Sequence, residues 1–176
     1  MLKNQNPLIQ DFLKAAEQVG FAWKAGEIFH ELISGPHKPP AQRPDMCAIY
    51  VFSLMESFGR GCAAGPHRVL KVGQVGANSG PRFQYQHYRP GSAQSTVAGS
   101  LLAARILWPF IGIDSLTEED VKDWLLENTD RDHFYFGSSG SNAQDKPLLT
   151  VFERYMKGRL GPVLEGISGP WESIPR

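Results

Sequence analysis

The 176-residue sequence predicts an α+β fold: a small mixed three-stranded sheet flanked by helices, with an N-terminal helical pair. Three observations predict this class. Two apolar runs have the pattern of neighbouring strands, and a short aromatic run much later has the pattern of a third. The segments between and after them show helical spacing or helix-capping residues.

The first 45 residues are expected to form two helices and a linker. Asn6 is a favourable N-cap before Pro7, and Gly20 ends this first helix. A second helix is predicted over residues 24–34, where apolar side chains gather on one side, and residues 35–44 are too rich in proline for regular structure. Two short helices around a turn also fit a DNA-reading helix-turn-helix, although a pair that packs on a core is the commoner arrangement.

The sheet is predicted from three segments. Residues 46–54 (MCAIYVFSL) are apolar on both faces and should form a central strand. Residues 68–75 (RVLKVGQV) follow a loose glycine-rich connection and are expected to pair antiparallel with the first strand. HFYFG, residues 133–137, is the third strand.

Helices are predicted at residues 81–88, 95–107 and 145–160, the last one closed by a Gly-Pro pair. Another helix is expected before the third strand, because Ser115 and Glu118 have the spacing of a capping box. No internal repeat is visible.

Composition narrows the possible functions. Eighteen basic residues balance eighteen acidic ones, so no overall field attracts nucleic acid, and contact with DNA would need a local basic patch. No apolar run approaches the length that spans a membrane. Cys47 and Cys62 form no pattern, which favours free thiols and a cytoplasmic location, although a single disulfide stays open.

The glycine-rich stretch after the second strand allows one alternative, a small-molecule nucleotide enzyme. Gly73, Gly76 and Gly80 follow a strand, as glycines do where backbone amides hold a phosphate. However, their spacing does not match the dinucleotide fingerprint, and no Gly-Lys-Ser/Thr of a P-loop is present. Thermal stabilisation by a nucleotide, without affinity for DNA, would indicate this alternative.

Two strand residues have side chains suited to chemistry. Tyr50 lies in the central strand, and Lys71 lies in the next one, on the same face as Val69 and Gly73 if side chains alternate. A lysine within an apolar strand either protects a sheet edge or is a partly desolvated amine with a lowered pKa.

Two residues on predicted helices complete the set. Arg82 follows the glycine loop, and one helix face would hold Arg82, Tyr85 and Arg89, an arrangement suited to a backbone phosphate; the alternative is a solvated surface arginine. Glu153 lies at the border of the apolar stripe of the last helix, where it could face the sheet or only pair with Lys157 one turn on.

These residues, in this order, resemble the GIY-YIG nuclease superfamily. Ala48-Ile49-Tyr50 stands for its first motif and Lys71-Val72-Gly73 for its second. Arg82 matches the arginine that the superfamily carries on a helix, and Glu153 matches the metal-binding glutamate on the helix after the third strand. The resemblance spans about residues 46–166.

The sequence departs from the superfamily pattern at several positions. The first glycine is Ala48, and the second tyrosine is Lys71, as in some restriction endonucleases of the superfamily. Glu165 stands where many members have an asparagine, and His87 follows the arginine by five residues rather than by one turn. The loop between the two motif strands is longer than usual.

The resemblance implies hydrolysis of a DNA phosphodiester by activated water with one divalent cation, Mg²⁺ or alternatively Mn²⁺. Glu153 would bind the metal, Arg82 would hold the non-bridging oxygens, and Tyr50 and Lys71 would activate the water, with Lys71 favoured as base or proton relay. The residues expected to bind substrate are Gly73, Tyr85, His87 and Arg89.

The same resemblance divides the chain into an N-terminal helical extension and linker (1–45), a nuclease-like domain (46–166) and an irregular tail (167–176). It leaves open a catalytically degenerate module that only binds DNA or takes part in an assembly. Ala48, Lys71 and Glu165 favour this second possibility.

Overall fold

The computed structural model describes residues 6–55, 68–92 and 96–166. Its strands are β1 (Phe29–Ile33), β2 (Met46–Leu54), β3 (Val69–Val75) and β4 (Thr129–Gly137). They form a single four-stranded sheet of order β1-β4-β2-β3, in which all neighbouring strands are antiparallel. The α+β class is therefore confirmed, whereas the expected mixed three-stranded sheet is wrong.

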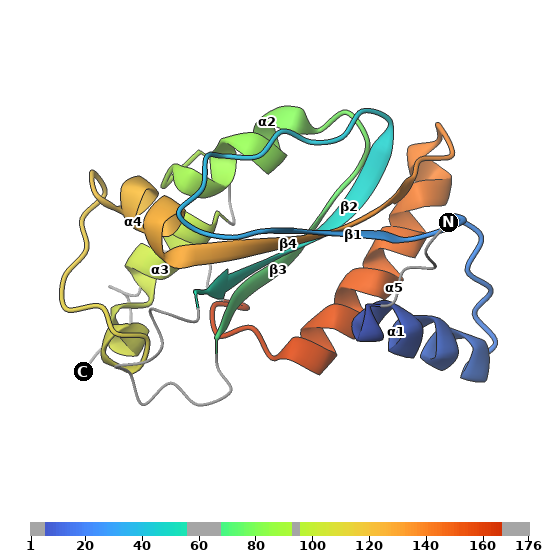
Figure 1. Ribbon diagram of the computed structural model, residues 1–176, viewed down its shortest axis with the longest axis horizontal. Coiled ribbons are helices and arrows are strands. Elements are labelled where there is room, and N and C mark those ends of the chain that lie inside the picture. The colour runs from blue at the N-terminus through green and yellow to red at the C-terminus, as the bar shows by residue number, and fades with distance from the viewer. Residues whose placement is uncertain (1–5, 56–67, 93–95, 167–176) are drawn as a thin grey trace.

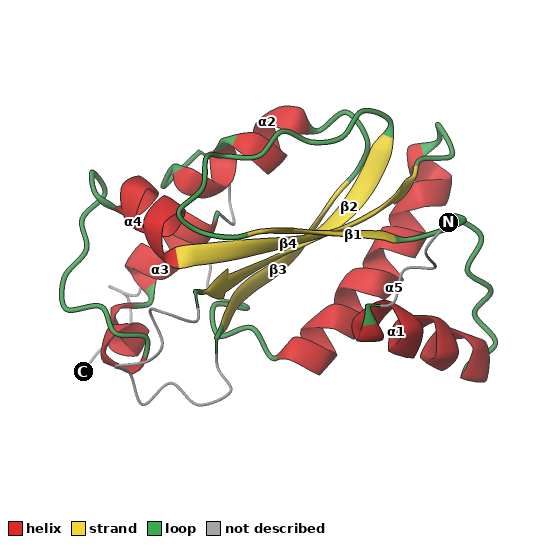
Figure 2. Cartoon of the chain, in the orientation of Figure 1, coloured by secondary structure: helices red, strands yellow, loops and turns green. Residues whose placement is uncertain are grey.

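Helices cover both faces of this sheet (Figure 1). They are α1 (Pro7–Gln18), α2 (Gly80–Gln84), α3 (Val97–Ala103), α4 (Val121–Asn128) and α5 (Asn142–Leu160), with 3-10 turns η2 (Gln86–Tyr88) and η3 (Arg105–Phe110). One face packs under α1 and α5, and the other under α2, α3 and α4 (Figure 2). Each face has its own apolar core, so the sheet separates two layers of helices.

The predicted second helix, residues 24–34, is wrong, because its second half is strand β1. Gly26 has a φ of 74°, in the left-handed region that interrupts a helix. From Phe29 to Ile33 every residue pairs with β4, beginning with Phe29 opposite Tyr135. Pairing with a distant strand thus outweighs the helix-like spacing of the apolar residues. The helix-turn-helix alternative fails with this helix.

The two predicted strands at residues 46–54 and 68–75 are confirmed as β2 and β3, and they pair antiparallel as expected. β2 lies between β4 and β3, and β3 forms an edge of the sheet. Side-chain alternation along β3 breaks once, because the register with β2 shifts between Phe52 and Ser53 at a bulge. Val69 therefore packs in the core beneath α5, whereas Lys71 and Gly73 lie opposite Phe52 and Tyr50 in the other layer. The expectation that Lys71 shares a face with Val69 is wrong.

Several element boundaries differ from those expected. β4 begins four residues before the predicted strand. The segment predicted as one helix over residues 81–88 consists of α2 and η2, which meet at Tyr85. The capping box is wrong as well: α4 begins after Asp120, whose carboxylate accepts a 2.7 Å hydrogen bond from the Thr117 hydroxyl.

The start of α1 and the end of α5 follow their local signals. In α1 the Asn6 side chain accepts a hydrogen bond from the backbone N–H of Leu8, as predicted for an N-cap. α5 begins three residues before the predicted start and ends before Gly161, whose φ of 56° closes the helix.

Some expectations concern parts of the chain that the structure does not describe. Cys62 and the predicted tail at residues 167–176 lie outside the described residues. Cys47 is a buried free thiol. Within residues 6–55, 68–92 and 96–166, no helix is long and apolar enough to cross a bilayer.

Candidate active site at the edge of the sheet

The glycine of the second motif gives Tyr50 its position. Gly73 in β3 lies directly opposite Tyr50 in β2, and a Cβ atom at Gly73 would overlap the phenol ring and hydroxyl of Tyr50. The ring therefore lies across the backbone of β3 at Gly73, and its hydroxyl lies over this edge strand. No residue other than glycine would leave this space.

Lys71 lies two residues before Gly73, on the same face of β3. Its side chain is 6% exposed, and its Nζ donates a 2.8 Å hydrogen bond to the hydroxyl of Ser100 in α3. The pKa of Lys71 is lowered to about 8, mainly by burial and also by the positive charges of Lys157 and Arg82, while Glu165 and Glu153 act in the opposite direction. The lysine is thus a desolvated amine, one of the two alternatives that the sequence left open.

The chain after α5 returns along the edge of β3. The backbone N–H groups of Val163 and Leu164 donate hydrogen bonds to the carbonyls of Val69 and Leu70, at 3.0 and 2.9 Å. This short pairing covers the free edge of the strand and places Glu165 close enough to raise the pKa of Lys71.

Glu153 approaches the same place from the other layer. α5 packs against β3 and β2, with Phe152 and Met156 buried beneath the sheet. The Glu153 side chain is 14% exposed, and burial raises the pKa of its carboxyl group. Its charge acts on both Tyr50 and Lys71, although these two residues face the opposite layer. Glu153 therefore lies at the edge of β3, where the two layers meet.

Lys157 links the two carboxylates of this edge. Its Nζ is 3.3 Å from Oε1 of Glu153 and 2.6 Å from Oε1 of Glu165. Burial alone would lower the pKa of Lys157, but the hydrogen bond to Glu165 and the charge of Glu153 outweigh it, so this pKa is raised. The alternative reading of Glu153 as the partner of Lys157 is thus also correct.

Arg82 reaches the cluster from α2. The pKa of Tyr50 is raised to about 12, because burial outweighs the side-chain hydrogen bond from Arg82 and the charges of Arg82 and Arg131, which act in the opposite direction. The Tyr50 hydroxyl is therefore protonated at neutral pH and in contact with an exposed arginine. We call Tyr50, Lys71, Arg82, Glu153, Lys157 and Glu165 the edge cluster.

The remaining predicted substrate residues divide into two kinds. Tyr85 and Arg89 are exposed, on either side of η2, and do not share one helix face with Arg82 as expected, because the helix breaks at Tyr85. His87 is buried and lies against Tyr50, with 4.6 Å between the ring centroids. Its imidazole ring therefore packs against Tyr50 and is not exposed to solvent.

A fully buried arginine holds this helical segment against the sheet. Arg131 of β4 donates hydrogen bonds to the Phe83 carbonyl at 3.1 and 3.2 Å and to the Tyr88 hydroxyl at 3.1 Å. Its guanidinium also lies 4.6 Å from the ring centroid of Phe52 and 4.7 Å from that of Phe83. Because Phe83 adjoins Arg82 along the chain, Arg131 fixes the segment that carries Arg82.

Arg131 is not among the residues predicted for the site. It lies in the polar segment TDRD just before the predicted third strand, where a charged side chain is normally exposed. Only the start of β4 at Thr129, four residues earlier than expected, places it in the core.

The side chains at the edge of β3 supply only some of the oxygen ligands that a divalent cation needs. In the described residues no group of three or more histidine, cysteine or acidic side chains is arranged to hold a metal. Glu153 and Glu165 nevertheless already share one cation, the Lys157 ammonium, so this position favours positive charge. Glu153 fits as a hard oxygen ligand, and substrate phosphate oxygens and water would have to complete the coordination.

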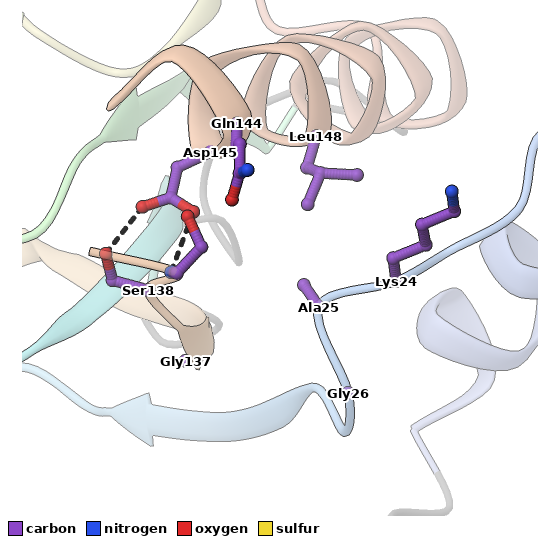
Figure 3. A pocket seen from close by; sticks show the side chains of 9 residues that line it. Lys24, Ala25, Gly26, Gly137, Ser138, Gln144, Asp145 and Leu148 are labelled. Carbon is purple, nitrogen blue, oxygen red and sulfur yellow. Dashed lines mark hydrogen bonds between the residues drawn. The ribbon is translucent and has the colours of Figure 1, made fainter. Parts of the chain in front are cut away.

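A separate hollow lies at the start of α5 (Figure 3). It has a volume of about 730 Å³ and is lined by residues that include Lys24, Gln144 and Leu148. Asp145 points toward the loop before α5, where its carboxylate accepts hydrogen bonds from the Ser138 hydroxyl and the Ser139 backbone N–H. This carboxylate closes the loop before the helix and is eight residues before Glu153, about 12 Å along the helix axis.

Comparison of the chain with protein-family models, with curated proteins and with solved structures gives no match.

Proposed function

We propose that this protein is a metal-dependent endonuclease of the GIY-YIG type, which hydrolyses DNA phosphodiester bonds by activated water. One observation carries the proposal. Tyr50, Lys71, Arg82 and Glu153 come from four different elements, and the charges of Arg82 and Glu153 act on both Tyr50 and Lys71. Four residues that are distant in sequence therefore lie around one short stretch of the β3 edge.

The charge of the edge cluster suits a phosphate. Three cations, Lys71, Arg82 and Lys157, face two carboxylates, so the cluster carries a net charge of +1 when Lys71 is protonated. Arg82 is exposed and can make two parallel hydrogen bonds to the non-bridging oxygens of a phosphodiester. In this role it would stabilise the charge that develops on the phosphoryl group.

Lys71 is the proposed base or proton relay. A lysine at its ordinary pKa is almost fully protonated at neutral pH, whereas a pKa of about 8 leaves a useful fraction as the free amine. Its hydrogen bond to Ser100 fixes the side chain and offers a hydroxyl through which a proton can pass. Lys71 would take the proton of the attacking water.

Tyr50 is the proposed orienting group. With a pKa of about 12 its hydroxyl remains protonated, so it can donate one hydrogen bond to the attacking water or to the phosphate while it accepts one from Arg82. The buried contact with His87 keeps the ring in place.

Glu153 is the proposed metal ligand. Mg²⁺ bound there would shield the phosphoryl charge and acidify a bound water molecule. The chain itself supplies one carboxylate, so we expect weak binding of the metal in the absence of DNA. Tyr85 and Arg89, which are exposed beside the cluster, are proposed to contact the DNA backbone farther from the cleaved bond.

A plasmid assay distinguishes the nuclease from the alternative, a degenerate module that binds DNA without cleavage. If the protein is a nuclease, it should nick a supercoiled plasmid in Mg²⁺ and leave the plasmid intact in EDTA. Binding of DNA that weakens with salt, with no nicking in either Mg²⁺ or Mn²⁺, would favour the degenerate module. Thermal stabilisation by a free nucleotide, with no affinity for DNA, would favour a small-molecule nucleotide enzyme instead.

A further inference from the structure

The Lys157 ammonium occupies the position next to the proposed metal ligand. Its two contacts are unequal, at 3.3 Å to Glu153 and 2.6 Å to Glu165. The partners also differ in exposure: the Glu153 side chain is 14% exposed and the Glu165 side chain 40%. Lys157 thus has a short contact with the more exposed carboxylate, Glu165, and a longer contact with the less exposed one, Glu153.

A divalent cation and an ammonium compete for the same carboxylate. Both bind to the lone pairs of the Glu153 carboxylate, and two cations on one carboxylate repel each other strongly in a partly desolvated site. Lys157 contacts Oε1 of Glu153, so a metal that uses this oxygen, or both oxygens of the carboxylate, must displace the ammonium. Glu165 offers the place to which it can withdraw, because the shorter of the two ion pairs persists when the longer one breaks.

We infer that Lys157 is the counter-ion that a divalent cation displaces from Glu153, and that Glu165 holds Lys157 away once the metal is bound. This inference depends on the metal role of Glu153 in the proposed function. It gives Glu165, which replaces the superfamily's asparagine, a role in controlling metal affinity. Lys157 and Glu165 act through Glu153 and are positioning residues.

Two substitutions should shift metal affinity in opposite directions. Lys157→Met removes the competitor and leaves two carboxylates at the site, so Mn²⁺ should bind about five- to tenfold more tightly, the size expected for a partly buried ion pair. Glu165→Gln leaves Lys157 with Glu153 as its remaining carboxylate, so Mn²⁺ should bind more weakly than to the unchanged protein.

The measurement is Mn²⁺ binding in the absence of DNA, by electron paramagnetic resonance of the free ion, with circular dichroism to check the fold. Lys146→Met is the matched control, because it removes one positive charge from an exposed position on the same helix. It should leave Mn²⁺ affinity unchanged. Glu153→Gln should abolish binding at the site.

The outcomes separate this inference from the proposed function. If Glu153→Gln abolishes Mn²⁺ binding while Lys157→Met and Glu165→Gln both retain the original affinity, the counter-ion role is overturned and the metal ligand stands. If Glu153→Gln leaves Mn²⁺ binding unchanged, the metal role of Glu153 fails and this inference fails with it. If neither the unchanged protein nor Lys157→Met binds Mn²⁺, the counter-ion role is overturned, because removal of the ammonium then does not free a metal site.

Discussion

The Nζ atom of Lys71 lies 2.8 Å from the hydroxyl oxygen of Ser100, so strand β3 and helix α3 are joined by a hydrogen bond within the layer that also contains Tyr50. The lysine cannot move freely toward solvent while this bond persists. Together with burial, which lowers its pKa to about 8, the contact turns an ordinarily mobile, charged side chain into a fixed amine.

The pH dependence of cleavage should follow the protonation state of the Lys71 amine. If Lys71 is the base, only its deprotonated form is active, so kcat/KM for plasmid nicking should rise as pH increases through about 8 and level off above it. Lys71→Met should lower the plateau by about 10²- to 10⁴-fold, the usual contribution of a general base. An unchanged ascending limb in Lys71→Met would assign that limb to another group.

Gly73→Ala should reduce activity through Tyr50. The added methyl group would overlap the Tyr50 ring and hydroxyl, which must move, at a cost of about 1–3 kcal/mol in the free energy of unfolding. Gly76→Ala is the matched control, because no atom lies within 4 Å of a Cβ built at that position. Urea unfolding and nicking rates, measured for both variants, should show a loss in Gly73→Ala alone; equal behaviour would contradict the position given to Tyr50.

Arg82→Ala should slow cleavage strongly. Loss of a donor that stabilises transition-state charge typically lowers kcat by about 10²- to 10³-fold. Arg89→Ala provides the comparison, since both arginines are exposed and belong to the same segment. We expect it to weaken DNA binding and reduce its salt dependence with little change in kcat. Similar kcat values for both variants would contradict a specific role for Arg82.

The protein should lose stability in mild acid. Burial, together with the charge of Arg131, lowers the pKa of His37, His87 and His133, that of His133 to about 2. Below pH 6.5 the unfolded chain therefore binds protons that the folded protein does not, so the free energy of unfolding falls as pH falls.

A histidine that stays neutral while folded contributes up to about 1.4 kcal/mol per pH unit well below pH 6.5, and about 1.6 kcal/mol between pH 6.5 and 5. Urea unfolding at the two pH values measures the sum. His87→Phe should reduce the slope, because a phenyl ring can replace the imidazole against Tyr50 without taking up a proton. A slope that is the same in His87→Phe would contradict the neutral state of His87.

Parts of the fold and the site follow from local sequence. The apolar runs of β2 and β3, the N-cap Asn6 and the helix end at Gly161 are all recognisable without a structure. The border position of Glu153 on the apolar stripe of its helix is also local information. The side chains proposed for catalysis were therefore within reach of sequence analysis, although their roles remain proposals.

The rest depends on contacts between distant segments. β1 has helix-like apolar spacing and becomes a strand only because β4 offers it a partner. The bulge between Phe52 and Ser53 puts Val69 and Lys71 on different faces of the sheet, and no local pattern predicts it. The pairing of Val163 and Leu164 with β3, which brings Glu165 to Lys157, has no signal in the sequence for the same reason.

The most direct test of the proposed function compares the unchanged protein with Glu153→Gln in a supercoiled-plasmid nicking assay, with and without Mg²⁺. Glutamine keeps the size of the side chain and removes the charge that binds the metal, so the fold should persist, as circular dichroism and thermal unfolding can establish. We predict Mg²⁺-dependent nicking by the unchanged protein and none by the folded variant. Full nicking by folded Glu153→Gln, or nicking that does not need Mg²⁺, would contradict the assignment of Glu153 as the metal ligand.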